Sequence, residues 1–261
     1  MLKILNCAVA DIREGLGRAP LWIALAKEDI NDQHRRTTLG PAWLFISYTM
    51  YVGSLFLVFG ENSSIPNFIA YVSIGMVVFL FLQDVVFQSV SLFSREESFI
   101  GGTNLPMSIY ILRMTMQSLI RFSYAATGCL IFVLVSGTPI SLYWMVSILG
   151  LSLIFLALPA VITVLATCGA FFPDMQFVVA NVIRVFIFLT PIFWQRSGGW
   201  RDRLYQWNPF THFIEIVRLP ITAHVVPYHS LVICLVITVL SWVAAIYLLG
   251  KYRKQIVFLI M

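Results

Sequence analysis

The sequence predicts an all-α integral membrane protein, and three observations support this prediction. Residues 122–173 form a run of 52 residues without Asp, Glu, Lys, Arg or His. Hydrophobic residues make up 59% of the chain and charged residues 11%, whereas a soluble domain has about 45–50% and about 25% respectively. Backbone polar groups in lipid must be paired within the protein, and long apolar runs favour helices over the alternating segments of a barrel.

The long apolar run is too long to cross a bilayer once. At about 1.5 Å per residue it would extend roughly 78 Å, and one crossing needs about 20 residues. Residues 136–139, Ser-Gly-Thr-Pro, supply turn chemistry in its middle. The run therefore predicts two membrane-spanning helices joined by a short turn.

Residues 1–40 are polar and basic, and they form a predicted cytoplasmic N-terminal region. Pro20 suits a helix start. We predict a short amphipathic helix on the membrane surface here, and a solvated, disordered tail is the alternative. Apolar residues follow the proline at helical spacing, namely Leu21, Trp22, Leu25 and Ala26.

Six membrane-spanning helices are predicted within a transmembrane domain that covers residues 41–250. The chain length of 261 residues suits one helical membrane domain, and no second soluble domain is visible in it. Each predicted span is an apolar stretch of about 20 residues or more. The spans cover residues 41–60, 67–93, 111–135, 143–171, 176–195 and 230–250.

The distribution of positive charge predicts the orientation. Of the 17 Lys and Arg residues, 11 lie on one side of the six spans, and the turns near 61–66 and 136–142 hold none. Lys and Arg concentrate in cytoplasmic loops, so both termini are predicted to be cytoplasmic, with 251–261 as a tail and an even number of spans. The 11 residues are Lys3, Arg13, Arg18, Lys27, Arg35, Arg36, Arg95, Arg113, Lys251, Arg253 and Lys254.

Two connections between spans have unusual compositions. Residues 94–106 begin with acidic residues and continue with an apolar pair, Gly-Gly and Pro, which predicts a short cytoplasmic helix; a plain turn is the alternative. The segment after the fifth span is too polar for a crossing and too aromatic for a simple loop. We predict two periplasmic half-helices over 197–225, divided at Asn208-Pro209. A loop that carries an interfacial aromatic belt is the alternative.

Three charges fall inside predicted spans, where a charge is costly and usually faces a partner or a cavity. Asp84 and Arg184 each lie ten residues from a cytoplasmic end, which is about 15 Å of helix, and so share one depth. A buried ion pair between them is our first hypothesis, and Arg121 is the rival partner. Charges that snorkel or face water are the remaining alternative.

The sequence holds no motif for catalysis or metal binding. GxxxxGK[ST], HExxH and GxSxG do not occur, and the four Cys and four His lack metal-ligand spacing. His212 and Glu215 would share a helix face, as a membrane acyltransferase or protease would require, but a structural role is the alternative. We therefore predict no catalytic residue, no metal and no cofactor in this chain.

Several motifs are shared with one known family. The most specific are Arg-Arg followed by Leu-Gly-Pro-Ala-Trp over 35–43 and the Asn-Pro-Phe segment that begins at Asn208. Across essentially the whole chain the sequence resembles the permease subunits of ABC exporters for bacterial surface polysaccharides, O-antigen exporters above all. Capsule and teichoic acid exporters are relatives. Further matching stretches are residues 27–30, 104–106, 171–175 and 190–194.

The resemblance implies partners and a location in the bacterial inner membrane. It implies a second copy of this chain, two copies of an ATP-binding subunit that hold ATP and Mg, a lipid-linked polysaccharide, and membrane lipids, but no nucleic acid. The amphipathic helix and the 94–106 helix would meet the ATP-binding subunit, and the half-helices would gate the outer mouth. The implied coupling residues are Asp29, Arg35, Arg36, Arg95, Glu96, Glu97 and Phe99. The implied gate residues are Asn208, Pro209, His212, Glu215 and Arg218.

Aromatic residues are the candidates for lining the channel that the family forms between two permeases. Sugar rings offer apolar CH faces, and aromatic rings stack on these faces without one fixed register, so a polymer can slide. For each residue, lipid-facing or core packing is the alternative. The candidates are Trp43, Tyr48, Phe193, Trp194, Trp200, Trp207 and Phe210.

Three functions are compatible with the sequence. The first is the permease of an ATP-driven exporter for O-antigen-like polysaccharide. The second is an ABC exporter permease for a teichoic acid, capsule, lipid or drug. The third is a membrane enzyme that acts on a lipid-linked glycan. No chain of acidic or histidine residues crosses the spans, which argues against a proton-coupled carrier.

Overall fold

The computed structural model describes residues 2–61, 63–196 and 198–260, and every regular element within these ranges is a helix. This confirms the all-α prediction. Four residues lie outside this description, namely 1, 62, 197 and 261. They fall, in that order, within the predicted ranges 1–40, 61–66, 197–225 and 251–261. Five helices of the described chain are long and apolar enough to cross a membrane: α3 (Ala42–Phe59), α4 (Phe68–Val90), α7 (Met107–Val135), α8 (Trp144–Phe171) and α12 (Tyr228–Ile260).

The remaining predicted span, 176–195, corresponds to the shorter helix α9 (Met175–Leu189). Its 15 residues extend about 22 Å, less than the roughly 30 Å of a bilayer core. The helix ends because Thr190 is extended and Pro191 lacks the N–H that would continue the hydrogen-bond ladder. The count of six spans therefore stays a prediction.

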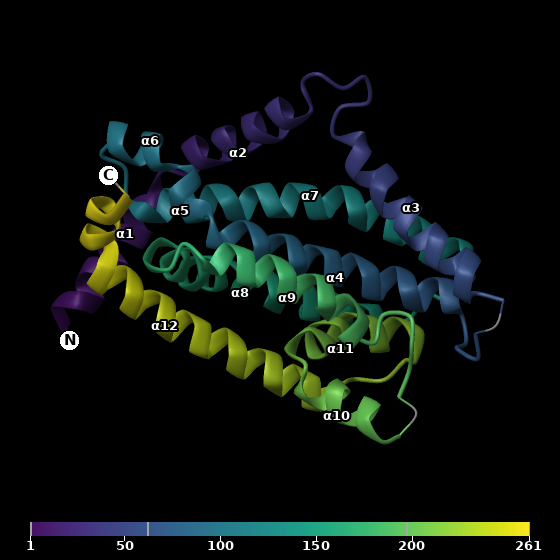
Figure 1. Cartoon of the computed structure of the whole chain (residues 1–261). Coiled ribbons are helices and arrows are strands. Elements are labelled where there is room, and N and C mark those ends of the chain that lie inside the picture. The colour runs from purple at the N-terminus through teal and green to yellow at the C-terminus, as the bar shows by residue number, and fades with distance from the viewer. Residues whose placement is uncertain (1, 62, 197, 261) are drawn as a thin grey trace.

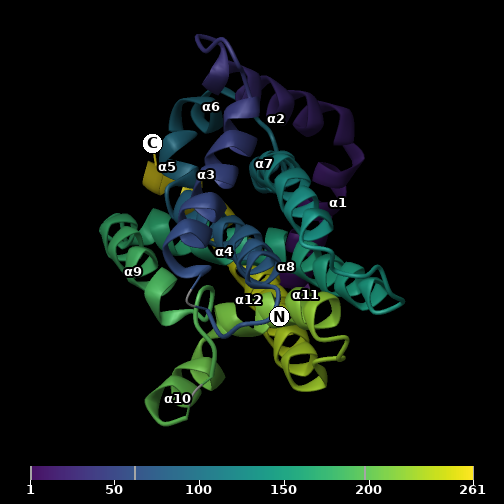
Figure 2. The same cartoon turned by 90° about the vertical axis from the view of Figure 1, so that its right-hand side faces the viewer.

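Helix α4 is the centre of the bundle. It packs against α3, α7, α8, α9 and α11, and the end view shows it between α9 on one side and α7 on the other (Figure 2). Almost every residue from Phe68 to Phe79 is buried. A helix that is apolar on all faces suits this position, because it has no polar face to turn toward water.

The N-terminal region contains two helices, α1 (Leu2–Gly17) and α2 (Ala19–His34). Helix α2 matches the predicted helix, and it buries Ala26 and Ile30 while it packs on α7. The alternative of a disordered tail is wrong. Helix α1 was not predicted, and it packs against α7 and α12.

Two predicted boundaries at this end of the molecule are corrected. The 94–106 segment is not one helix but two, α5 (Leu92–Arg95) and α6 (Glu97–Gly102), followed by an extended stretch. The predicted tail is not a separate segment, because α12 continues through it to Ile260. Arg253 of α12 lies 3.2 Å from the Asp11 carboxylate of α1, so the two ends of the chain meet at one end of the bundle (Figure 1).

Toward the opposite end of the bundle, the chain forms α10 (Trp200–Trp207) and α11 (Pro209–Thr222) (Figure 1). The two helices divide at Asn208-Pro209, where the sequence predicted a break. Helix α11 packs against α4, α8 and α12, whereas α10 projects away from the bundle (Figure 2). Their position at the outer membrane face stays a prediction.

We predict that Gly169 cannot be replaced without loss of stability. A Cβ atom on this residue of α8 would lie 1.8 Å from the Val90 carbonyl oxygen, and a main-chain atom cannot rotate away. We expect Gly169→Ala to lower the free energy of unfolding by about 1–3 kcal/mol, measured by thermal unfolding in detergent. Gly53→Ala is the matched control, because a Cβ at this helical glycine meets nothing within 4 Å. Equal stability of the two variants would contradict the close approach.

Candidate functional site

Polar and charged side chains gather in two clusters at opposite ends of the bundle. We name the first the ion-pair network; it joins α2, the α5–α6 junction, α4 and α7. We name the second the α11 cluster; it joins α11 to α4 and to the turn that follows α9. The two clusters contain most of the residues that the sequence predicted for coupling, gating and intramembrane charge.

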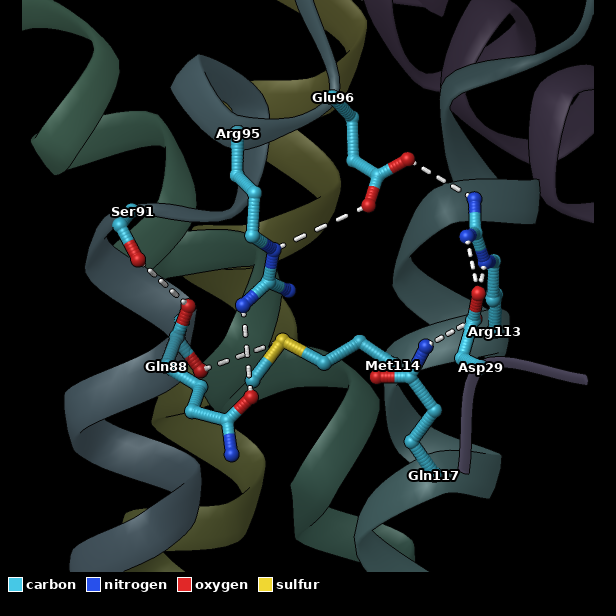
Figure 3. A network of polar contacts seen from close by, with 9 residues as sticks. Asp29, Gln88, Ser91, Arg95, Glu96, Arg113, Met114 and Gln117 are labelled. Carbon is cyan, nitrogen blue, oxygen red and sulfur yellow. Dashed lines mark hydrogen bonds and ion pairs between the residues drawn. The ribbon is translucent and has the colours of Figure 1, made fainter. Parts of the chain in front are cut away.

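Arg113 of α7 is the branch point of the ion-pair network (Figure 3). Its Nε and Nη2 atoms donate to the two carboxylate oxygens of Asp29, each at 2.6 Å. Its Nη1 atom donates to Glu96 at 2.8 Å, and Gln117 also donates to Asp29. A bidentate arginine–carboxylate contact is the strongest form of this interaction. The arginine thus fastens both α2 and the α5–α6 junction to α7.

The network continues into the bundle along α4. Arg95 lies 3.8 Å from the Glu96 carboxylate and donates to the Gln88 side chain at 3.4 Å (Figure 3). Gln88 donates to Asp84 at 2.6 Å, and Arg121 of α7 donates to the other oxygen of Asp84 at 2.8 Å. A continuous polar path therefore runs from α2 to an ion pair deep in the bundle. Its charges balance, with three cations (Arg95, Arg113, Arg121) and three carboxylates (Asp29, Glu96, Asp84).

The predicted pairing of Asp84 with Arg184 is wrong, and the rival partner Arg121 is confirmed. Arg184 lies on an exposed face of α9 and forms no ion pair within the described ranges. Equal depth along two helices does not fix the direction in which a side chain points. The sequence therefore identified a charged layer but not its partners.

Three other residues predicted for coupling lie outside the network. Arg35, Arg36 and Glu97 are exposed, and the Arg35 guanidinium lies 3.9 Å from the Asp32 carboxylate. Phe99 does belong to the network, because its ring lies 5.6 Å from the Arg113 guanidinium. The exposed residues are free to contact another protein.

Asp11 is a structural residue that sequence reasoning missed. Its buried carboxylate accepts hydrogen bonds from the backbone N–H groups of Met107 and Ser108, at 3.3 and 2.9 Å. These groups begin α7 and have no partner within their own helix, so a carboxylate there is favourable. Nothing in the sequence distinguishes Asp11 from a solvated surface acid, because its partners lie about a hundred residues away.

Arg218 is the centre of the α11 cluster, and its side chain is fully buried. It pairs with Glu215 one turn earlier. Its Nη1 atom donates to the Pro191 carbonyl at 2.6 Å, and its guanidinium lies 3.8 Å from the centre of the Tyr71 ring. Gly75 of α4 leaves room for the guanidinium, because a Cβ there would lie 3.3 Å from Nη1. A buried arginine requires such partners, because an unpaired buried charge is strongly destabilising.

The remaining gate candidates hold the start of α11. Asn208 accepts a hydrogen bond from the Phe210 N–H at 2.9 Å and donates to Thr190 at 2.8 Å. Pro209 occupies the first helical position, where its missing N–H costs nothing. His212 is buried, and its Nε2 atom lies 3.0 Å from the Gln206 carbonyl. Because a carbonyl only accepts, Nε2 donates this hydrogen bond, and Nδ1 lies 3.0 Å from the Ser230 hydroxyl.

These contacts disfavour the catalytic alternative for His212 and Glu215. Both ring nitrogens of His212 are engaged, and the Glu215 carboxylate is buried against Arg218. A general base needs a lone pair that a substrate can reach. The arrangement fastens helices together and leaves no accessible acid–base pair.

The predicted channel aromatics do not form one site within a single chain. Tyr48 belongs to the core, where its hydroxyl donates to the Ser73 carbonyl at 2.9 Å. Phe210 packs against that core. Trp43, Trp200 and Trp207 are exposed, with 43%, 66% and 85% of their surface accessible.

Phe193 and Trp194 line a cavity of about 400 Å³ near the α11 cluster, together with Phe59, Arg196 and Arg201. Phe193 stacks on Phe59 with ring centres 5.4 Å apart and 12° between the planes. Arg196 lies over the Tyr205 ring at 4.6 Å. Burial raises the pKa of the Tyr205 phenol above its ordinary value, so this ring is a neutral cation–π partner. The cavity combines apolar rings with cationic groups.

The fold and the two clusters define a multi-pass helical membrane protein whose buried charges join helices. The family described as ABC-2 type transporter matches residues 20–222, from α2 to the end of α11. The chain belongs to this family and is therefore the membrane subunit of an ABC exporter rather than its catalytic subunit. The resemblance inferred from the motifs is confirmed at this level.

A curated relative is similar over most of the chain. The O-antigen export system permease protein RfbA of Myxococcus xanthus is 21% identical over 192 residues, which are 71% of this chain and 72% of the relative. This relative is named as a permease for O-antigen export.

We predict that Asp84 is energetically coupled to Arg121 and not to Arg184. In a double-mutant cycle with Asp84→Asn and Arg121→Gln, thermal unfolding should give an interaction energy of about 0.5–3 kcal/mol, because the two side chains share a hydrogen bond. Asp84→Asn combined with Arg184→Gln is the matched control and should be additive within about 0.5 kcal/mol. Coupling to Arg184 alone would restore the rejected pairing.

We predict that Arg218 is essential for stability. Arg218→Met should cost about 3–5 kcal/mol, because it leaves the buried Glu215 carboxylate without its cation. The double variant Glu215→Leu/Arg218→Met should recover part of this loss in the same thermal unfolding assay. Arg203→Met on the exposed face of α10 should change stability by less than about 0.5 kcal/mol. An effect of Arg218→Met as small as this control would contradict the assigned role.

Proposed function

We propose that the chain is the permease of an ATP-driven exporter that moves lipid-linked, O-antigen-like polysaccharide from the cytoplasm to the periplasm. The observation that carries this proposal is the ion-pair network in a chain of the ABC-2 family. The network ties α2 and the α5–α6 junction to the membrane helices α4 and α7. The O-antigen export named for the Myxococcus xanthus relative supports the choice of substrate.

The proposed topology has six spans in the bacterial inner membrane, with both termini in the cytoplasm. The ion pair between Asp11 and Arg253 joins the two ends of the chain, as an even number of crossings requires. The Phe171 ring at the end of α8 contacts Tyr252 near this end. Pro191, after α9, lies at the α11 cluster. Helix α9 and the residues after it therefore carry the chain across the bundle, which supports a sixth crossing.

The proposed coupling surface receives two copies of an ATP-binding subunit, which hold ATP and Mg. The exposed residues Arg35, Arg36 and Glu97 are suited to contact that subunit. A displacement of α2 or α6 would then reach α4 and α7 through Asp29, Glu96 and Arg113, because their contacts are short and largely buried. The network makes the surface and the membrane helices move together.

The proposed translocation channel lies between two copies of the chain. The exposed side chains of Trp43, Trp200 and Trp207 are free to contact a glycan or a second copy. The cavity around Phe193 and Trp194 adds aromatic and cationic groups near the predicted outer mouth. Sugar CH faces suit the rings, and the arginines suit any acidic group on the glycan.

The deciding experiment is ATP hydrolysis by the complex of this chain with its ATP-binding subunit in lipid. We expect stable co-purification and a severalfold stimulation of hydrolysis by lipid-linked O-antigen-type glycan. Asp29→Ala should reduce the stimulation, because it removes the carboxylate that fastens α2 to Arg113.

Glu28→Ala is the matched control on the same helix, since Glu28 is exposed and belongs neither to the network nor to the proposed contact residues. It should preserve stimulation at the level of the unmodified chain unless it also weakens docking, which co-purification reports separately. Stimulation by a lipid or drug but not by the glycan would favour the alternative substrates. A chain that binds no ATP-binding subunit would contradict the proposal.

A further inference from the structure

A cavity of about 190 Å³ opens between α3, α4 and α7, next to the innermost ion pair of the network. Its walls are mainly apolar, with Leu44, Leu80 and Phe122 among the lining residues. Asp84 and Arg121 supply its charged groups. Tyr48 also lines the cavity, and α9 contributes no lining residue.

The Arg121 guanidinium has a donor with no acceptor. Its Nε atom donates to Asp84 and its Nη2 atom to Ser118, but its Nη1 atom is buried without a hydrogen-bond partner in the described chain. Only 11% of the Arg121 side chain is exposed. Leaving a buried donor unsatisfied is costly, so a small rotation of the guanidinium that turns Nη1 toward an acceptor in the cavity would be favourable.

The charges of the cavity restrict the kind of molecule that fits. Arg121 and Asp84 cancel each other, so a ligand with a large net charge would be unbalanced there. Asp84 is the more open partner, with 33% of its side chain exposed, and each of its oxygens can accept a second hydrogen bond. A suitable ligand has an anionic group for Arg121 and a cationic group that donates a hydrogen bond to Asp84. An alkyl chain on the same ligand would match the apolar walls.

The depth of the cavity agrees with a lipid on the cytoplasmic side, given the orientation proposed above. Asp84 lies 16 residues from the start of α4 at Phe68, and Arg121 lies 14 residues from the end of α7 at Val135. These separations correspond to about 24 and 21 Å of helix, measured from the predicted outer ends. In a hydrocarbon core of about 30 Å, this leaves the pair about 6–9 Å from the inner boundary, a depth from which a long arginine side chain reaches toward a headgroup.

We propose that this cavity binds an inner-leaflet phospholipid with a phosphoethanolamine headgroup. The phosphate accepts from Nη1 of Arg121, the ammonium group donates to Asp84, and an acyl chain lies along α3 and α4. The lipid thereby completes the ion-pair network at its inner end. The proposal depends on the orientation of the chain in the membrane but not on the identity of the exported substrate.

The test is native mass spectrometry of the full-length chain in mild detergent, with added lipids of identical acyl chains. We expect retention of one phosphatidylethanolamine in preference to phosphatidylcholine and phosphatidylglycerol. Arg121→Gln should weaken this binding roughly tenfold, because a charge-assisted hydrogen bond to phosphate is lost. Asp84→Asn should abolish the preference over phosphatidylcholine, whose quaternary ammonium cannot donate a hydrogen bond.

Two further variants keep the test decisive if the charge variants fold poorly. Ala125→Phe fills the cavity from α7 without altering either charge and should also prevent retention. Arg184→Gln, on the exposed face of α9, should retain the lipid at the unmodified level. Equal retention of the three lipids, or retention unaffected by both Arg121→Gln and Ala125→Phe, would overturn the proposal.

A competition experiment separates a structural lipid from the lipid carrier of the substrate. Polyprenyl diphosphate added at an equal concentration should not displace phosphatidylethanolamine, because its net negative charge is not balanced in the cavity. Displacement would overturn the phospholipid assignment in favour of the carrier. Glycan-stimulated ATP hydrolysis is measured independently, so failure of lipid binding and failure of the exporter function are distinguishable.

Discussion

Charge pairing inside a helical bundle is the constraint on which this structure depends. A membrane interior has no bulk water to solvate an ion or a backbone group, so leaving either without a partner there is costly. Arg113, Arg121 and Arg218 each bridge different segments of the chain rather than neighbours on one surface. Pairing thus determines which helices lie together at both ends, while apolar packing around α4 fills the space between them.

The two clusters differ in a way that matters for transport. The ion-pair network is a line of alternating charges, several of them partly exposed, that connects short surface helices to α4 and α7. The α11 cluster is compact and fully buried, and it fixes α11 against α4. An open pair such as Arg95–Glu96 can change its pairing at modest cost, whereas a buried charge such as Arg218 cannot lose its partner without a large penalty.

Much of the fold could be predicted from the sequence, because long apolar runs and breaker residues act locally. The five long helices, α2 and the division at Asn208-Pro209 follow from such signals. The choice between Arg121 and Arg184 for Asp84, the role of Asp11 and the contact of Tyr71 with Arg218 could not be predicted, because each depends on how helices far apart in the chain pack. Helix α1 could have been predicted, because Leu5, Val9, Ile12 and Leu16 recur at helical spacing, but its packing on α7 and α12 could not.

The contact between Arg218 and residue 191 has a consequence for sequence variation. The acceptor there is a main-chain carbonyl, so its chemistry does not depend on which side chain occupies the position. What matters is the path of the chain after α9, which brings that carbonyl within 2.6 Å of the guanidinium. Substitutions at this position should therefore be tolerated better than insertions or deletions in the turn before residue 191.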